Sequence, residues 1–336
     1  MGALRVYRSL EEVPGDFGPC ALTIGNFDGV HAAHRRILRR VVAAARANGW
    51  KPSALTFEPH PATVVAPERA PKLLTSPIER AGLMQSEGIE QVLILPFTEA
   101  VAHLSPREFV ENILVKRLGV RAVLVGENFR FGRNQAGNVA TLKELGRKCG
   151  FQTETISAIA LRGRMVSSSA IRRLIEQGAV SAAARLLERW YALESAVIPG
   201  RGVGSAQTVP TLNLGLEAEV LPAVGVYVTR ALDAEEGRSW PSVTNVVYRP
   251  TFGGDSLSVE TFLLSALNGR PPRRIRVEFL FRLRDERKFP SAEDLKAQIL
   301  RDARWARAYH GRLRRWCEAP AEATVGTGSR APWALK

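Results

Sequence analysis

The first half of the chain alternates short apolar runs with segments whose apolar residues recur at helical spacing. Short apolar runs of this kind predict buried strands, here at residues 20–24, 53–57, 91–95 and 122–125. Helical spacing predicts helices, here over residues 35–45, 76–87 and 105–118. The last two begin with a Ser–Pro pair, which is typical of a capped helix start. Strands and helices that alternate in this way predict a doubly wound parallel α/β sheet.

The second half has a different pattern. Residues 179–190 predict a connecting helix rich in alanine, and the runs after it are shorter and alternate with a period of two. This alternation predicts strands, here at residues 225–229, 258–264 and 274–284. The apolar residues of the last strand are expected on one face: Ile275, Val277, Phe279, Phe281 and Leu283. Short alternating strands predict a small β-barrel or a β-sandwich.

A final helix is expected to close the second half. Ser291 is the predicted N-cap, and Asp294 stands at the capping-box position. The residues expected on its buried side are Leu295, Ile299 and Trp305. We therefore expect an α/β domain over residues 1–182, a barrel domain with a C-terminal helix over 183–316, and a flexible tail over 317–336.

Composition narrows the class of protein. The 336 residues are enough for two hydrophobic cores, and an apolar content of 45% is ordinary for a globular chain. The three cysteines are widely spaced, which indicates neither a disulfide framework nor a zinc site. The sequence contains no signal-peptide pattern and no apolar run near the ~20 residues of a membrane span. A cytoplasmic protein is therefore expected.

The net charge of +14 comes mainly from arginine. A basic balance suits nucleic acid, a membrane surface or phosphorylated small molecules. No aromatic-interleaved RNA-binding signature and no zinc finger accompanies the arginines of residues 270–315. The favoured interpretation is a solvated arginine-rich surface, with no nucleic-acid or membrane partner.

The segment that joins the first strand to the first helix carries candidate chemistry. His31 and His34 are three residues apart, so both imidazoles are expected on one face of the first helical turn. Backbone amides and the positive end of the helix dipole favour a phosphate at the same place. Gly25 and Gly29 allow the backbone to come close to a ligand. Histidines at this spacing also occur on solvated helices, which is the alternative interpretation.

Further polar segments follow other strands, and the carboxyl ends of parallel strands meet at one edge of a sheet. His60 lies between two prolines after the second predicted strand, where it forms either a binding wall or a rigid turn. Residues 126–137 combine glycines with arginines and two phenylalanines, which offer stacking surfaces and phosphate donors. Later, serines at 167–169 begin a helix, and Arg172 follows one turn on as a candidate phosphate ligand.

Together these motifs resemble the FMN adenylyltransferases that make FAD from FMN and ATP, whose signature reads G-x-F-D-G-x-H-x-G-H. The resemblance covers residues ~15–180, with Ala33, Asn128 and Ser169 as departures. It implies that His31, His34 and Arg172 hold the ATP phosphates and that the loop from Asn128 to Gly137 helps to hold the flavin. The nucleotide- and flavin-binding residues that it implies are Gly25, Phe27, Asp28, Gly29, His60, Asn128, Phe129, Gly132, Gly137, Ser167, Ser168 and Ser169.

The second half carries a separate motif. Gly200, Gly202 and Gly204 are expected to form a flexible loop able to wrap phosphates, and Pro210-Thr211-Leu212-Asn213 follows. This segment resembles riboflavin kinases over residues ~185–310, and the resemblance implies a small six-stranded-type β-barrel with a C-terminal helix. The resemblance implies that Thr211 and Asn213 hold Mg²⁺ beside the nucleotide phosphates and that Glu260 is the base that deprotonates the riboflavin 5′-hydroxyl. The departures from the family pattern include Ser205, Thr208 and Phe262.

The two resemblances imply a bifunctional enzyme that phosphorylates riboflavin to FMN and then adenylylates FMN to FAD. ATP is the co-substrate of both steps, Mg²⁺ is the metal, and FMN and FAD are products and ligands. The protein is expected to be a monomer or a weak homo-oligomer whose partners are riboflavin, FMN and ATP. One alternative is an FAD synthetase with a weakened kinase domain. Another is a basic nucleic-acid-binding or flavin-sensing protein without catalysis.

Overall fold

The computed structural model describes residues 3–198, 211–215, 218–251, 254–267 and 269–318. The chain divides into two compact units, Met1–Ser168 and Ser169–Lys336, which we call the N-terminal and C-terminal units. Within the described ranges, none of the helices combines the length and the apolar character needed to cross a membrane.

A six-stranded parallel sheet forms the centre of the N-terminal unit. Its strands lie in the order β1-β4-β3-β2-β5-β8. The four predicted strands are confirmed, as β2 (Cys20–Ile24), β3 (Lys51–Glu58), β4 (Gln91–Pro96) and β5 (Val120–Gly126). The edge strands, β1 (Arg5–Tyr7) and β8 (Gln152–Ile156), were not predicted. Both contain polar residues and lack the apolar run that marks a buried strand.

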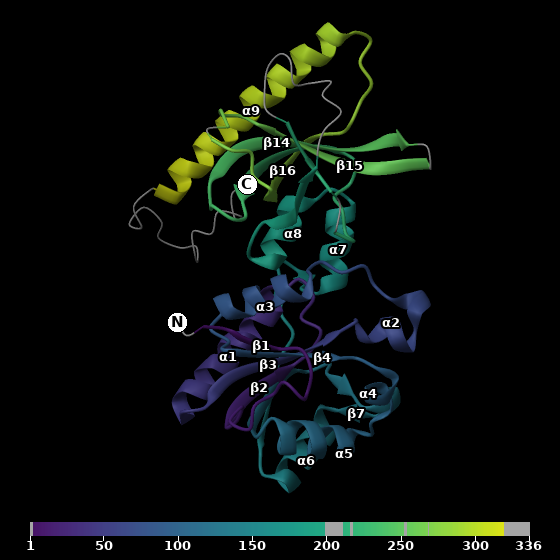
Figure 1. The fold of residues 1–336 in the computed structure, drawn as a ribbon, viewed down its shortest axis with the longest axis vertical. Helices are drawn as coiled ribbons and strands as arrows, with labels where there is room; N and C mark the ends of the chain where they lie inside the picture. Colours follow the sequence, from purple (N-terminus) through teal and green to yellow (C-terminus); the bar gives the residue numbers. More distant parts are fainter. Residues whose placement is uncertain (1–2, 199–210, 216–217, 252–253, 268, 319–336) are drawn as a thin grey trace. The chain divides into compact units, whose positions relative to one another are not determined.

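Helices cover both faces of this sheet, as a doubly wound fold requires (Figure 1). On one face, α1 (Ala32–Asn48) and α3 (Pro77–Ser86) pack on strand residues such as Ala21. On the other face, η2 (Phe109–Arg117), which follows the short α5 (Pro106–Glu108), and α6 (Val139–Cys149) pack on residues such as Leu22. Successive strand residues therefore enter different cores, because side chains alternate across a sheet.

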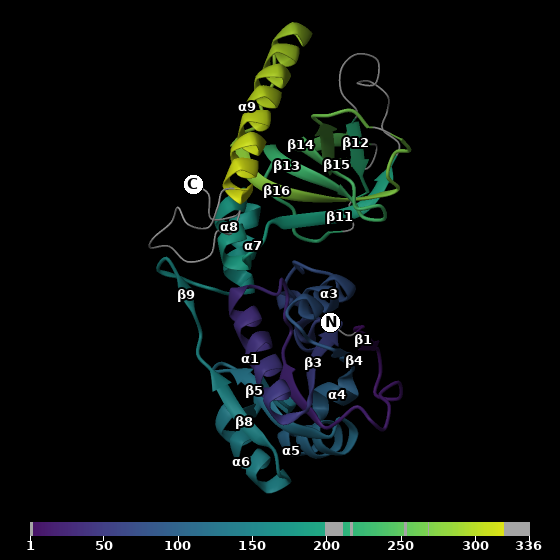
Figure 2. The same cartoon turned by 90° about the vertical axis from the view of Figure 1, so that its left-hand side faces the viewer.

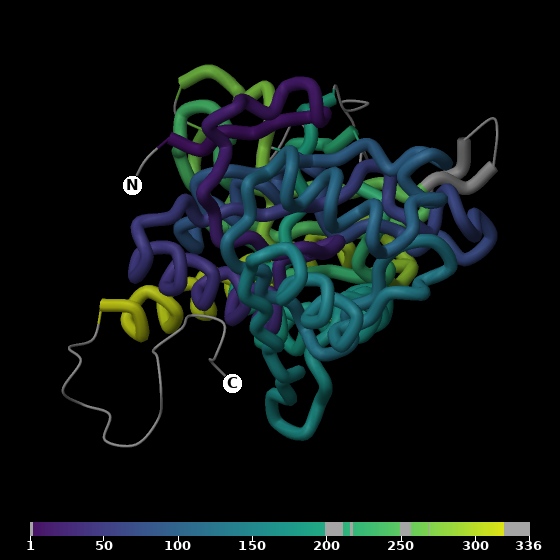
Figure 3. Tube along the Cα trace, turned by 90° about the horizontal axis from the view of Figure 1, so that it is seen from below, coloured from purple at the N-terminus to yellow at the C-terminus, as the bar shows by residue number. Residues whose placement is uncertain are grey.

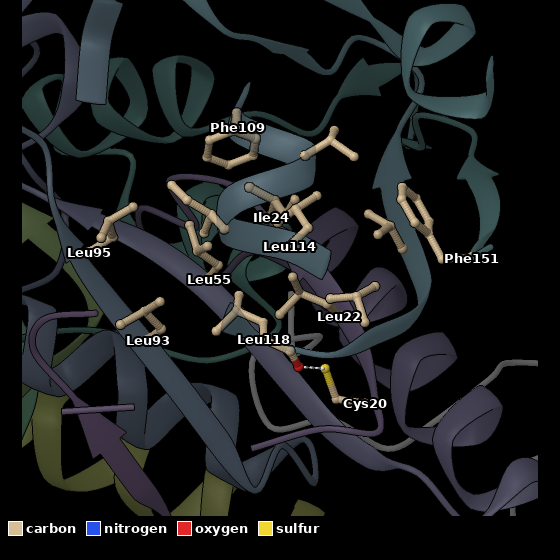
Figure 4. Packing of buried hydrophobic residues seen from close by; sticks show 14 of the residues in the cluster. Cys20, Leu22, Ile24, Leu55, Leu93, Leu95, Phe109, Leu114, Leu118 and Phe151 are labelled. Carbon is tan, nitrogen blue, oxygen red and sulfur yellow. Dashed lines mark hydrogen bonds between the residues drawn. The ribbon is translucent and has the colours of Figure 1, made fainter. Parts of the chain in front are cut away.

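The second of these cores is drawn in Figure 4, where Leu22, Leu55 and Leu114 come from two strands and the η2 segment. The Cys20 thiol donates a hydrogen bond to the carbonyl of Leu118 at 3.4 Å. Burial raises the pKa of this thiol to about 12, so Cys20 acts as a small packing residue and not as a nucleophile.

The predicted helix over residues 105–118 contains two kinds of helical turn. Ser105 and Glu108 form a capping box at the start of α5, as the Ser–Pro start suggested. From Phe109 to Arg117 the hydrogen bonds follow π-helical spacing. The periodicity of apolar residues does not distinguish this wider turn from an α-helix.

The remaining short elements of the N-terminal unit border the loops after the strands. They are α2 (Pro61–Val65), η1 (Pro67–Arg69), α4 (Glu99–His103), β6 (Arg130–Phe131), η3 (Arg133–Gln135), β7 (Gly137–Asn138), β9 (Ala160–Leu161) and β10 (Arg164–Met165). The β9–β10 hairpin, drawn in teal, extends away from the sheet in two views (Figures 2 and 3).

The C-terminal unit is a closed six-stranded antiparallel barrel, as predicted, in the order β11-β12-β15-β14-β13-β16. Two short helices, α7 (Ser168–Glu176) and α8 (Val180–Leu187), precede it, and the long helix α9 (Ala292–Glu318) runs beside it (Figure 2). The strands are β11 (Tyr191–Ile198), β12 (Thr211–Leu214), β13 (Gly225–Asp233), β14 (Ser239–Thr251), β15 (Gly254–Leu263) and β16 (Arg274–Arg284).

Hydroxyl groups line part of the barrel interior. Thr229 lies 2.8 Å from both Ser242 and Thr244, and Thr244 lies 3.0 Å from Thr261, measured between the hydroxyl oxygens. All four residues are fully buried. Each hydroxyl has a hydrogen-bond partner, so these polar groups are accommodated inside the barrel.

The apolar residues of β16 were predicted to share one face of the strand, and this prediction is wrong beyond Phe279. Thr229 pairs with Phe279, but the preceding Val228 pairs with Phe281, so Leu280 is an extra residue at a β-bulge. The bulge turns Phe281 toward α9, where its ring stacks on Trp305 with centroids 5.1 Å apart. The expected alternation assumes regular pairing, which a bulge interrupts.

The start of α9 was predicted correctly, but its buried side was not. The Ser291 hydroxyl accepts a hydrogen bond from the Asp294 amide at 3.1 Å. Leu295, Ile299 and Trp305, however, are 42%, 38% and 37% exposed. The residues of α9 that are buried are Asp302, Ala303, Ala306 and Leu313. The side chain of Asp302 accepts from Arg284 at 2.8 Å, which fixes the helix on β16 through a polar contact.

Candidate active sites

The loop between β2 and α1 presents two stacked imidazoles. His31 is the N-cap of α1, one residue before the helix, and its Nδ1 accepts a hydrogen bond from the His34 amide at 3.4 Å. The two rings are nearly parallel, at 13°, with centroids 3.6 Å apart. Because Nδ1 accepts, the proton of a neutral His31 is on Nε2, which is then a donor. The Phe27 ring, in the core, packs edge-on against His34 and supports it.

The same loop is fixed to the segment before α3. The Asp28 carboxylate, 2% exposed, accepts from the backbone amides of Leu74 and Thr75 at 2.9 and 3.2 Å. Gly29 has a φ of 77°, which favours glycine, and its amide donates to the Thr75 hydroxyl at 3.0 Å. These contacts hold the backbone that carries the two histidines. The Asp28 side chain thus has a structural role in this loop.

Arg80 of α3 lies beneath this loop and is only 2% exposed. Its Nη1 donates to the Thr56 hydroxyl at 3.1 Å, and its Nη2 donates to the Thr75 carbonyl at 3.3 Å. The Thr56 hydroxyl in turn donates to the carbonyl of Asn26 at 3.1 Å. Burial lowers the pKa of Arg80, and the carboxylates of Asp28, Glu58 and Glu79 oppose this shift. No sequence motif marks Arg80, which supports the loop from within the fold.

We expect Arg80→Met to destabilise the N-terminal unit by about 1–3 kcal/mol, because buried acceptors lose their donor. The measurement is urea unfolding of the full-length chain. The control is Arg69→Met on η1, an exposed arginine whose removal should change stability by less than about 0.5 kcal/mol. Equal effects of the two variants would contradict a supporting role for Arg80.

His60 and the third polar loop lie after β3 and β5. His60 caps α2, its Nδ1 accepts from the Ala62 amide at 3.1 Å, and its Nε2 lies 2.9 Å from the Asn26 side-chain amide. The loops after β2 and β3 are therefore in contact, as their shared sheet edge predicts. In the third loop, a Cβ at Gly137 would lie 2.7 Å from the Phe131 ring, so this glycine permits a close approach.

The candidate flavin contacts of this third loop differ from one another in exposure and packing. Asn128 is exposed. Phe129 is half-buried, stacks on Phe131 with centroids 5.4 Å apart and packs on the sheet's second core. Gly132 has a φ of 71°.

The serines expected at the start of α7 divide between two roles. The Ser168 hydroxyl donates to the backbone carbonyl of Asp28 at 2.8 Å, which connects the start of the helix to the histidine loop. Ser167 is half-buried and Ser169 is exposed. The Ser169 hydroxyl accepts from Nη1 of Arg172 at 3.2 Å, one turn further along α7.

In the C-terminal unit, the proposed metal ligands and the proposed base lie on adjacent strands. Asn213 of β12 pairs directly with Glu260 of β15, and Thr211 pairs with Phe262. Glu260 also pairs with Asn245 of β14 on its other side. Directly opposite residues share a face of the sheet, so the three side chains form a row. Gly200, Gly202, Gly204 and Pro210, also expected in this site, lie outside the described residues.

A cavity of about 670 Å³ opens at the end of this row. Val226, Asn245 and Glu286 are among its lining residues, together with the segment that leads into α9. Burial raises the pKa of the Glu286 carboxyl, Arg284 lowers it, and the charge of Glu260 raises it again. The proposed base therefore lies within electrostatic reach of the cavity wall. Asn245 and Glu286 were not identified from the sequence, because no motif marks them.

The oxygen donors present suit a magnesium ion. Asn213 is 9% exposed, and none of the described residues donates a hydrogen bond to its buried Oδ1. Amide and hydroxyl oxygens are ligands that Mg²⁺ accepts, with water and phosphate completing its shell. Among the described residues there is no group of three or more histidines, cysteines and carboxylates that could hold a metal.

Two family models match the chain in tandem. The FAD synthetase model matches residues 14–170, and the riboflavin kinase model matches residues 187–310. The chain is 36% identical to a bifunctional riboflavin kinase/FMN adenylyltransferase of Pseudomonas fluorescens, over 91% of this chain and 97% of the relative. It is 33% identical to the Escherichia coli K12 protein of the same description, over 93% and 98%.

A solved structure, described as a macrolide-efflux protein from Streptococcus pneumoniae, shares the fold with a TM-score of 0.81. It is 23% identical to this chain and covers 91% of it and 99% of itself. The tandem family matches and the identities of the two relatives, together with the two sites described above, lead to one conclusion. The chain belongs to the family of bifunctional riboflavin kinases/FMN adenylyltransferases.

Proposed function

We propose that the C-terminal unit phosphorylates riboflavin to FMN and that the N-terminal unit adenylylates FMN to FAD, each with ATP. The observation that carries this proposal is the presence of two separate sets of polar side chains suited to phosphate transfer. One is the stacked His31–His34 pair at the start of α1, and the other is the Asn213–Glu260 pair of adjacent strands. The match of both family models supports this function over an FAD synthetase with a weakened kinase.

In the adenylyl transfer, a phosphate oxygen of FMN attacks the α-phosphorus of ATP, and pyrophosphate leaves. We assign His31, His34 and Arg172 to the ATP phosphates. Donors held at fixed positions stabilise the charge that develops on the phosphoryl oxygens, and no covalent intermediate is needed. The contacts of Asp28 and Arg80 maintain this arrangement before substrate arrives, which reduces the reorganisation needed during the reaction.

In the kinase reaction, the 5′-oxygen of riboflavin attacks the γ-phosphorus, the bond to the β-phosphate oxygen breaks, and ADP leaves. Glu260 accepts the proton of the attacking hydroxyl. Thr211 and Asn213 would hold Mg²⁺, which neutralises phosphate charge when it is bound. The glycines of residues 200–204 would wrap the nucleotide phosphates.

We also propose boundaries and surroundings for the two activities. The adenylyltransferase domain covers residues 1–182, the kinase domain 183–316, and a C-terminal tail 317–336. The α9 helix extends to Glu318, and residues 319–336 lie outside the described part of the chain. The protein works in the cytoplasm on small molecules alone, as a monomer or a weak homo-oligomer.

Chromatography of the products tests the assignment of two activities. Riboflavin, ATP and Mg²⁺ should yield FMN first and FAD later, and FMN supplied directly should yield FAD. Chelation of the metal should reduce FMN formation by at least about 100-fold, because the phosphate charge is no longer neutralised. FAD formation from FMN without any FMN formation from riboflavin would instead identify a single-activity enzyme.

A further inference from the structure

Asn245 lies between the proposed base and the cavity. It pairs with Glu260 on one side and with Val226 on the other, along a continuous row across β15, β14 and β13. Val226 belongs to the core that α9 covers, together with Ala306 and Leu313. The row therefore lies on the outer face of the barrel, where Asn245 and Val226 both line the 670 Å³ cavity.

The side-chain oxygen of Asn245 has an unused accepting position. The atom is buried, and no donor among the residues that the structure describes reaches it. Buried polar atoms without a partner are rare, and each one costs stability unless another group satisfies it. Because Asn245 lines a cavity, a bound molecule is the natural source of the missing donor.

This oxygen is poorly placed to share a magnesium ion with Asn213. Neighbouring strands are ~4.8 Å apart, so the backbones of β12 and β14, on either side of β15, are about 9.6 Å apart. Two oxygens that bind one Mg²⁺ lie no more than about 4.2 Å apart. Side chains that stand roughly perpendicular to the sheet do not close this gap. The metal and the donor to Asn245 therefore belong on opposite sides of Glu260.

The cavity has the character of a site for an amphipathic substrate. Its volume lies within the ~300–1,000 Å³ of small-molecule sites. Val226, Phe289 and Leu295 offer apolar surface to a flat ring system. Asn245 offers a hydrogen-bond acceptor next to Glu260, where a hydroxyl chain attached to such a ring would end.

We propose that Asn245 is a substrate-binding residue of the kinase site. Its Oδ1 accepts a hydrogen bond from a hydroxyl of the riboflavin polyol chain, which holds the terminal hydroxyl against Glu260. This inference rests on the proposed kinase function. It assigns recognition of the polyol chain to β14 and leaves the nucleotide and the metal to the side of β12.

The test is steady-state kinetics of FMN formation by the full-length Asn245→Leu variant. The KM for riboflavin should rise about 5- to 30-fold, because one buried hydrogen bond is lost, while the KM for ATP stays within about 2-fold. Lumiflavin, which has the ring but lacks the polyol chain, should inhibit the variant and the unchanged protein with similar Ki. The unchanged KM for ATP and the unchanged Ki of lumiflavin report that the barrel of the variant is folded, because both ligands bind to the C-terminal unit in the proposed function.

Two further variants separate hydrogen bonding from packing. Asn245→Asp keeps the accepting oxygen, so the KM for riboflavin should stay within about 3-fold. Val247→Leu lies two residues further along the same face of β14, does not line the cavity, and should leave the KM for riboflavin unchanged.

Several results would overturn the inference. These are an unchanged KM for riboflavin in Asn245→Leu, an increase in the KM for ATP instead, or a parallel increase in the Ki of lumiflavin. A riboflavin KM in Asn245→Asp as high as that in Asn245→Leu would also overturn it. If the unchanged protein forms no FMN from riboflavin, the proposed function itself fails, and that result is distinct from all of these.

Discussion

Replacement of Glu260 by Gln is expected to reduce FMN formation from riboflavin by about 10²–10⁴-fold, the usual contribution of a general base. The amide has nearly the same shape as the carboxylate, so the strand pairing of Glu260 with Asn213 and Asn245 should persist. The amide does not accept the proton of the attacking hydroxyl. FAD formation from supplied FMN should be unaffected, and separate assays of the two reactions measure this difference.

The matched control is Glu194→Gln on β11, which removes a carboxylate of the same barrel that is 42% exposed. It should leave both reactions within about 2-fold of the unchanged protein. If Glu260→Gln abolished FAD formation while FMN formation continued, the two activities would be assigned to the wrong units.

Replacement of His31 by Asn is expected to impair FAD formation and not FMN formation, the opposite of the effect of Glu260→Gln. Asparagine is a strong N-cap, so the start of α1 should remain formed without the imidazole. Loss of one donor to the phosphates should reduce FAD formation from FMN by about 10²–10³-fold. Riboflavin phosphorylation should be unchanged, and chromatography of each reaction gives both values from one preparation.

His103→Asn provides the control for a histidine on the same unit. His103 is in the last turn of α4, is exposed, and hydrogen-bonds to the Glu99 carbonyl at 2.7 Å. Its replacement should leave FAD formation unchanged. A similar loss of FAD formation in both variants, or none in His31→Asn, would remove His31 from the phosphate site.

The sequence predicted the central strands well because each is buried on both faces and therefore reads as a continuous apolar run. β2 matches the predicted residues 20–24. The barrel strand β16 was predicted from its alternating pattern instead, and it matches 274–284. The edge strands were missed, since one side of each lacks a neighbour in the sheet. β1 has only three residues, and the residues of β8 are mostly polar.

The incorrect predictions concern tertiary packing. The buried side of α9 was predicted from its large apolar residues, yet Ala303 and Ala306 are buried and Leu295 is exposed. Small residues allow a helix to approach a sheet closely. Which face of the helix is buried therefore depends on the surface against which it packs. The bulge at Leu280 depends in the same way on a neighbouring strand.

Within the sites, the residues found from the sequence are those in recognisable motifs, such as His31, Asn213 and Glu260. The residues missed are Arg80, Asn245 and Glu286. Arg80 reaches its site from a helix, Asn245 through a strand pairing, and Glu286 from the wall of a cavity. Each lies in a segment separate from the motif residues that it joins. Their local sequence carries no signal of this, because the relevant contacts are made only in the folded chain.

The four hydroxyls inside the barrel have a consequence for evolution. A hydroxyl in the middle of such a chain serves two neighbours, as Thr244 serves Thr229 and Thr261. A single exchange of Thr244 for valine would remove the partner of the Thr261 hydroxyl, while Thr229 would keep Ser242. Simultaneous exchange of several of these residues for aliphatic ones would leave no such unpartnered hydroxyl. Relatives of this chain should therefore vary at these positions in a correlated manner, with either all hydroxyls kept or most of them lost together.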